Sequence, residues 1–259
     1  MQVMILCGGL GTRLREETEY RPKPMVEIGG RPIVWHIMKH FAQHGMRQFI
    51  LCLGYKAMVI KEYFLRYEES NNDFTISLGS ERKVTYHQAH QEQAFDVTLA
   101  DTGLHTMTGG RVKRASRYVQ DSPFIVTYGD GLADVDIAEL VRFHKSHGKL
   151  ATVTTVCPQS RFGILELGAG GVVHSFAEKP KVDGWANAGF FVFERKVLDY
   201  LSEDAGCILE REPLERLAKE GQLVAFRHPG FFQAMDTYRE YQMLNELWDQ
   251  GKAQWKTWT

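Results

Sequence analysis

The chain has 259 residues, with 31 Lys or Arg against 32 Asp or Glu, and its formal net charge is −1. So balanced a surface gives no reason to expect a nucleic acid or an anionic membrane as a partner. The length is sufficient for one large domain or two smaller ones, and we expect a single domain over residues 1–259.

The first predicted element is a short buried strand at residues 3–6 (Val-Met-Ile-Leu). Gly8, Gly9 and Gly11 follow, and the pattern then predicts a helix with Arg13 on its first turn. A strand that leads through glycines into a helix N-terminus offers unpaired amides and positive dipole to an anion. We therefore expect a phosphate-binding loop. The glycines fit neither the dinucleotide fingerprint nor a Walker A loop, and a tight turn without a ligand is the alternative.

About ten residues further on, Lys23 stands between two prolines in Arg-Pro-Lys-Pro-Met (residues 21–25). Each proline favours an extended conformation in the residue before it. We therefore expect Lys23 to lie on a stiff, non-helical segment from which its side chain reaches back toward the glycine loop. A solvent-exposed lysine in a proline turn is the alternative.

The remaining elements alternate between strands and helices. We expect strands at 49–53, 124–128, 151–156, 172–177, 188–193 and 223–227, and helices at 59–67, 137–147 and 240–250. This alternation predicts an α/β fold, a Rossmann-like, mostly parallel mixed sheet with helices on both faces. The polar residues 69–96 predict a loop or hairpin without function. An insertion that packs against a neighbouring subunit is the alternative.

Two acidic residues occur where ligands bind in such sheets, beyond the carboxyl ends of strands. Asp130 directly follows the strand at 124–128, and Asp236 precedes the last helix. Two carboxylates that converge on triphosphate oxygens would form a Mg²⁺ site. The alternatives are a turn former at Asp130 and a helix N-cap at Asp236. Asp134 and Asp136 are expected to cap the helix at 137–147.

Other metal and redox sites have little support. The ten histidines are scattered, and we expect the suggestively spaced His36, His40, His87 and His90 on helix surfaces or in loops, since no third zinc ligand follows. The four cysteines lie far apart without metal-ligand spacing, which is typical of a reduced, cytoplasmic protein. We also expect neither a signal peptide nor a membrane-spanning segment.

The motifs Gly-Gly-Leu-Gly-Thr-Arg-Leu (residues 8–14) and Pro-Lys-Pro-Met (residues 22–25) together resemble the signature of the sugar-1-phosphate nucleotidyltransferases. Further segments resemble the cytidylyl-transferring branch of this family: 26–30, 101–103, 107–111, 128–131, 176–180, 228–231, 235–237 and 255–258. The likeness extends from about residue 2 to the C-terminus. It implies the nucleotidyltransferase fold and the conversion of CTP and α-D-glucose 1-phosphate to CDP-glucose and pyrophosphate, with Mg²⁺ as cofactor.

The resemblance also implies roles for individual residues. Lys23, Arg13 and Asp130 would be catalytic, and Asp130 and Asp236 would hold Mg²⁺. The sugar phosphate would be bound by Glu178, Lys179, Asn187 and Gly189. The nucleotide would be bound by Leu6, Gly8, Gly9, Leu10, Gly11, Thr12, Arg13, Lys23, Thr106, Arg111 and Gly129.

Several alternatives remain open at the level of sequence. The base could be uracil or thymine, the sugar could be another hexose phosphate, or the chain could be a noncatalytic nucleotide-sugar-binding protein. The resemblance implies a symmetric homo-oligomer such as a hexamer. Cys7, in the glycine loop, is either a small-residue substitute or a source of sensitivity to thiol reagents.

Overall fold

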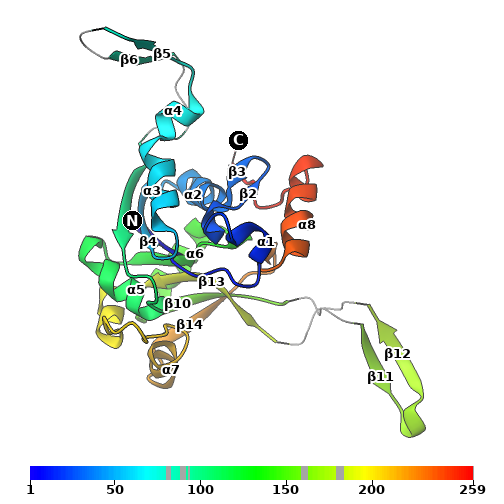
Figure 1. Cartoon of the computed structure of the whole chain (residues 1–259). Coiled ribbons are helices and arrows are strands. Elements are labelled where there is room, and N and C mark those ends of the chain that lie inside the picture. Colours follow the sequence, from blue (N-terminus) through cyan, green and yellow to red (C-terminus); the bar gives the residue numbers. More distant parts are fainter. Residues whose placement is uncertain (80–82, 88–91, 93, 159–162, 179–183, 259) are drawn as a thin grey trace.

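The computed structural model describes residues 1–79, 83–87, 92, 94–158, 163–178 and 184–258, and a seven-stranded sheet lies at its centre (Figure 1). Six strands are parallel to one another, and β13 runs antiparallel to both of its neighbours, β10 and β8. The mostly parallel mixed sheet is therefore confirmed. Across the sheet the strands are β14 (Leu223–Arg227), β10 (Ala151–Val156), β13 (Ala186–Phe193), β8 (Phe124–Tyr128), β1 (Gln2–Cys7), β4 (Gln48–Leu53) and β7 (Asp96–Asp101).

Both faces of the sheet are buried, as the central strand shows. In β1, Val3 and Ile5 belong to one hydrophobic core, while Met4 and Leu6 belong to the other. This alternation follows from the two-residue period of a strand. One face is covered by α2 (Ile33–Gln43), α3 (Ala57–Leu65), α6 (Ile137–His147) and α8 (Tyr238–Asp249), and the other by α5 (Thr108–Ala115), η4 (Arg195–Tyr200) and α7 (Glu212–Lys219). The short η2 (Ser116–Tyr118) directly follows α5.

The sequence predicted several elements with their bounds, including β8, β10, β14 and α6. Two predictions near the N-terminus are wrong. The first helix, α1, spans only Arg15–Thr18, so Arg13 precedes it and the helix is too short to supply much dipole. Lys23 is not on an extended segment but begins a 3₁₀ turn, η1 (Lys23–Met25). Proline at position 24 is compatible with that turn because the first helical positions need no intrahelical N–H donor.

Two hairpins extend away from the body of the molecule (Figure 1). The first comprises β5 (Phe74–Ser77) and β6 (Lys83–Tyr86) and follows the short helix α4 (Tyr67–Asn71), so the hairpin expected within 69–96 is confirmed. The second comprises β11 (Ile164–Leu167) and β12 (Val173–Ala177), with η3 (Ala169–Gly171) between them. The strand expected at 172–177 therefore exists, but it lies outside the central sheet.

Two short antiparallel ribbons lie beside the central sheet. One joins β2 (Glu27–Ile28) to β3 (Arg31–Pro32), and the other joins β9 (Gly131–Ala133) to β15 (Phe232–Ala234). The second ribbon brings Asp130 and Asp236 together, because these residues lie just outside the paired strands. The N–H of Met235 donates a hydrogen bond to the carbonyl of Asp130 at 2.9 Å, which extends the pairing to this point.

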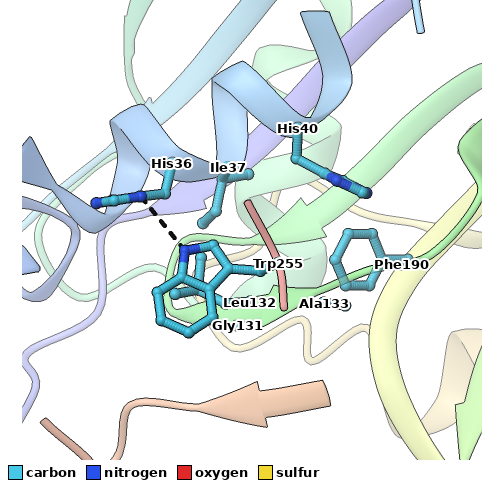
Figure 2. Close-up of a pocket in the computed structure, with 8 residues that line it drawn as sticks. All are labelled: His36, Ile37, His40, Gly131, Leu132, Ala133, Phe190 and Trp255. Atoms are coloured by element: carbon cyan, nitrogen blue, oxygen red, sulfur yellow. Dashed lines mark hydrogen bonds between the residues drawn. The ribbon is translucent and has the colours of Figure 1, made fainter. Parts of the chain in front are cut away.

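The C-terminal tail packs on its own chain, against the buried face of α2 (Figure 2). Trp255 is 1% exposed, and its Nε1 donates to Nδ1 of His36 at 3.4 Å. Nε2 of His36 lies 2.9 Å from the carbonyl oxygen of Ile28, to which it donates. His36 and His40 are thus buried, and their expected place on the helix surface is wrong. Within the part of the chain that the structure describes, no helix has the length and apolar character needed to span a membrane.

We predict that the free energy of unfolding falls as the pH is lowered from 6.5 toward 4. Burial lowers the pKa of His36 to about 4, so below pH 6.5 the unfolded chain binds a proton that the folded chain excludes. A protonated His36 would also turn a second N–H toward the N–H of Trp255. Between pH 7 and pH 5 the loss from this residue should reach up to about 2 kcal/mol in urea titrations. His36→Gln, which has no titratable ring, should lose less, and an equal loss in both proteins would contradict this account.

Candidate active site

A cleft of about 750 Å³ opens at the carboxyl ends of β1 and β8. Its volume lies in the range of ligand sites, and its position is where open α/β sheets bind their ligands. The residues around it come from segments spread over the whole chain. Those expected from the sequence that line it are Leu6, Gly8, Gly9, Leu10, Gly11, Thr12, Arg13, Lys23, Thr106, Arg111, Gly129, Asp130, Asn187 and Asp236.

Two cations and two carboxylates meet on one side of the cleft. Nζ of Lys23 lies 2.6 Å from Oδ2 of Asp130 and 2.7 Å from Oδ1 of Asp236. Nη2 of Arg13 lies 2.9 Å from the same oxygen of Asp236. The Lys23 side chain is only 10% exposed, whereas that of Arg13 is 69% exposed. Lys23 is therefore the fixed centre of the cluster, and Arg13 reaches it from solvent.

The carboxylate of Asp236 is available for this cluster because the next residue, Thr237, caps the following helix. Thr237 is the N-cap of α8 and forms a capping box with Glu240. Oε2 of Glu240 also accepts a hydrogen bond from the N–H of Asp236 at 2.7 Å. The N-cap alternative for Asp236 is therefore wrong.

Asp134 and Asp136, which were both expected to cap α6, differ in their roles. Asp136 caps α6 and accepts a hydrogen bond from the N–H of Glu139 at 2.9 Å, as expected. Asp134 does not cap that helix. Its Oδ1 accepts from the N–H of Phe231 at 2.7 Å and lies 2.9 Å from Nε2 of His228, so it joins β9 to the turn before β15.

Arg111 lines the cleft, but its guanidinium forms its hydrogen bonds with other groups of the protein. The residue is 4% exposed, and burial lowers its pKa. Its two terminal nitrogens donate, at 2.8–3.2 Å, to the carbonyls of Gly8, Leu53, Gly103 and Leu104 and to the hydroxyl of Thr102. The guanidinium leaves no space beside Gly8, where a Cβ would lie 2.1 Å from Nη1. Arg111 thus joins the glycine loop to the ends of β4 and β7.

Two further cleft residues are held by the surrounding structure. Thr106 is 5% exposed, and its hydroxyl accepts a hydrogen bond from Nη1 of Arg114 at 2.8 Å. Cys7 is 1% exposed, and burial raises the pKa of its thiol well above the ordinary value. A thiol of this kind remains protonated and unreactive, which favours the small-residue interpretation of Cys7.

Of the four residues that were expected to bind the sugar phosphate, the structure describes three, and of these only Asn187 lines the cleft. Gly189 follows Asn187 two positions later on β13. Glu178 is exposed just after β12 and lies outside the lining of the cleft. Lys179 lies outside the described residues.

Sequence reasoning missed several residues that line the cleft. Tyr128 and Phe232 contribute aromatic rings, and Leu104 and Met107 contribute partly exposed apolar side chains. The signal for Tyr128 was available, because it directly precedes Gly129 and Asp130 at the end of a predicted strand. Nothing in the local pattern indicated the others.

Comparison with protein families gives one assignment that covers most of the chain. The model of the nucleotidyl transferase family matches residues 2–225. Glucose-1-phosphate cytidylyltransferase of Salmonella typhimurium is 53% identical over 260 residues, which cover 100% of both chains. A probable glucose-1-phosphate cytidylyltransferase of Bacillus subtilis is 44% identical over 258 residues, again with 100% of both chains covered.

Solved structures are similar over nearly the same length. The HddC protein of Yersinia pseudotuberculosis complexed with GMP-PN gives a TM-score of 0.66 at 25% identity, covering 95% of this chain and 99% of the other. A putative glucose-1-phosphate thymidylyltransferase of Bacillus anthracis gives a TM-score of 0.70 at 20% identity, covering 95% and 94%. At this identity the second match supports the fold alone.

We predict that Arg111→Met destabilises the folded protein by about 2–4 kcal/mol, because it removes the hydrogen bonds that Arg111 donates to buried groups of three segments. Methionine keeps the apolar stem, so the loss measures the hydrogen bonds rather than the packing. Denaturation by urea is the measurement. Arg117→Met, at an exposed arginine in η2, is the matched control and should change the stability by less than about 0.5 kcal/mol. Equal losses in the two variants would show that the buried network adds no stability.

Proposed function

Because the chain belongs to the nucleotidyl transferase family, we propose that it transfers a cytidylyl group from CTP to α-D-glucose 1-phosphate, releasing pyrophosphate and CDP-glucose. The observation that carries this proposal is the convergence of Lys23, Arg13, Asp130 and Asp236 on one side of the cleft that the glycine loop borders. The full-length similarity to cytidylyltransferases supports the choice of base and sugar.

The reaction needs alignment and charge neutralisation more than proton transfer. A phosphate monoester has a second pKa of about 6, so near pH 7 the sugar phosphate is largely a dianion and needs no general base. One of its oxygens attacks the α-phosphorus of CTP, and the bond from that phosphorus to the bridging oxygen of pyrophosphate breaks. The protein must hold two mutually repelling anions in line and stabilise the charge that grows on pyrophosphate.

The cationic residues of the cleft suit this task. In the proposal, the segment from Gly8 to Thr12 holds the triphosphate through its backbone, and Arg13 neutralises phosphate charge from the exposed side of the cleft. Lys23 is the principal catalytic cation, because it is buried at the centre of the cluster and carries a compact charge with three N–H donors. Asn187, which also lines the cleft, contacts the sugar in the proposal, with Glu178 and Lys179 as further candidates for the sugar phosphate.

A divalent cation, Mg²⁺ in the proposal, would be held by Asp130 and Asp236. The donor set fits: two carboxylate oxygens lie within 2.7 Å of one ammonium nitrogen, so they already converge on a single positive charge. Mg²⁺ is commonly bound by one or two carboxylates together with phosphate oxygens and water. The described residues contain no group of three or more His, Cys, Asp or Glu that could hold a metal on its own. When bound, the ion would neutralise charge on the phosphates.

We further propose that residues 1–259 form one nucleotidyltransferase domain. Leu244 of α8 and Trp255 of the tail pack into the same core as β1, although they lie beyond residue 225. The four unpaired cysteines are consistent with a reducing compartment, and we propose that the protein works in the cytoplasm.

Self-association is also proposed, as a symmetric homo-oligomer such as a hexamer. The hairpin of β11 and β12 supports this, because it exposes Leu165 (48%), Leu167 (65%) and Phe176 (62%) away from the body of the chain. Monomeric proteins rarely expose apolar side chains in such groups.

Replacing Leu167 and Phe176 by Ser should lower the mass measured by analytical ultracentrifugation.

Pyrophosphate release is the direct test of the reaction. With α-D-glucose 1-phosphate and Mg²⁺, the rate should be highest with CTP among CTP, UTP, dTTP, ATP and GTP, and it should require both sugar phosphate and metal. A preference for UTP or dTTP would keep the mechanism and change the base. Folded protein that releases no pyrophosphate with any nucleotide or hexose phosphate would support the noncatalytic binding protein instead.

We predict that Lys23→Ala lowers kcat/KM by about 10²–10³, the usual cost of removing one preorganised donor from a transition state. Steady-state pyrophosphate release is the measurement, and circular dichroism reports whether the variant folds. Lys145→Ala, at an exposed lysine of α6, is the control and should retain the rate of the natural protein. Near-normal turnover of Lys23→Ala would remove Lys23 from the mechanism.

A further inference from the structure

One wall of the cleft is connected by hydrogen bonds to a carboxylate outside it. Tyr128, the last residue of β8, lines the cleft, and its hydroxyl donates to Oε1 of Glu210 in the segment before α7. The other oxygen of this carboxylate, Oε2, accepts from the hydroxyl of Thr108 at 2.6 Å. Thr108 begins α5 and also lines the cleft. One carboxylate therefore holds two walls of the cleft together.

Tyr128 in turn contacts the strand that presents Asn187. Nδ2 of Asn187 lies 3.4 Å from the hydroxyl oxygen of Tyr128, and Oδ1 of Asn187 accepts from the N–H of Gly189 at 2.7 Å. Gly189 has a φ of +78°, and a Cβ at this position would lie 2.2 Å from Cδ2 of Tyr128. The ring thus packs directly against the backbone of Gly189. Tyr128 therefore contacts both the side chain of Asn187 and the backbone that follows it.

The direction of each hydrogen bond follows from the number of protons. A phenolic hydroxyl has one proton, and here it is donated to Glu210. The same oxygen can then only accept from Asn187, which turns the amide nitrogen toward Tyr128 and the amide oxygen toward Gly189. Burial and the charge of Glu210 both raise the pKa of Tyr128, so the hydroxyl keeps its proton. The amide of Asn187 is held in one of its two possible orientations.

We propose that Glu210 and Tyr128 are positioning residues that orient the Asn187 amide for the hydroxyls of the sugar. This role rests on the proposed function, in which Asn187 contacts the sugar half of the substrate. Neither residue is placed at the reacting phosphates, and both act through Asn187. Without the carboxylate, the Tyr128 proton turns toward the amide nitrogen of Asn187, and the hydrogen bond that holds this nitrogen in place is lost.

Tyr128→Phe is the sharpest test, because it keeps the ring against Gly189 and removes only the hydroxyl. We expect the Kd of CDP-glucose to rise about tenfold and the Kd of CDP to change less than twofold, measured by isothermal titration calorimetry. CDP has the nucleotide half of CDP-glucose and lacks the sugar, so the comparison isolates the contacts of the sugar. Glu210→Gln should act in the same direction, because its NH₂ group cannot accept a hydrogen bond.

Tyr200→Phe is the matched control, since the Tyr200 hydroxyl also donates to a carboxylate, that of Glu220, at 2.5 Å on the exposed surface. It should change neither Kd. If Tyr128→Phe weakened both ligands equally, or neither, the positioning role would be wrong, whether or not Glu210→Gln folds. If the unaltered protein released no pyrophosphate from any nucleotide, the proposed function would fail, and this role with it.

Discussion

The pairing of Lys23 with two carboxylates is the interaction on which the rest of the site depends. Asp130 and Asp236 lie 107 and 213 residues from Lys23 in the sequence, so only the completed fold brings the three together. Two carboxylates this close repel one another unless a cation lies between them, and a buried lysine is equally costly without anions. Each charge therefore needs the others, and the ribbon of β9 and β15 is the element that holds the two acids in place.

A related constraint acts at the ends of the parallel strands, where the sheet gives way to loops whose carbonyl groups need hydrogen-bond donors. Arg111 supplies such donors to the carbonyl groups of the glycine loop and of the ends of β4 and β7. Glu210 is the corresponding acceptor, since its carboxylate accepts hydrogen bonds from the hydroxyls of Thr108 and Tyr128 on two walls of the cleft. The cleft is thus surrounded by polar side chains whose hydrogen-bonding groups are directed into the protein, and these fix the shape that a ligand meets.

Local sequence patterns predicted six of the seven strands of the central sheet and missed β7, and they were insufficient for the details of the site. An apolar run gave β8 with its bounds, because strands buried on both faces are largely apolar, and a run of Val and Thr gave β10, since β-branched residues favour strands. The same reasoning failed for Lys23, whose flanking prolines permit the first turn of a 3₁₀ helix as readily as an extended segment. It also could not foresee the partners of Arg111, because these acceptors are backbone groups contributed by distant segments. The family resemblance selected residues most of which line one cleft, while their chemical roles remain predictions.

The antiparallel strand β13 has a consequence for how the chain is made. β1 and β8 become available early in synthesis, but the free edge of β8 is covered only when residues 186–193 have left the ribosome. Until then an apolar strand edge next to the cleft remains exposed, and such edges recruit other chains. A nascent or truncated protein that ends before β13 would therefore be a substrate for chaperones and proteases rather than a smaller working unit.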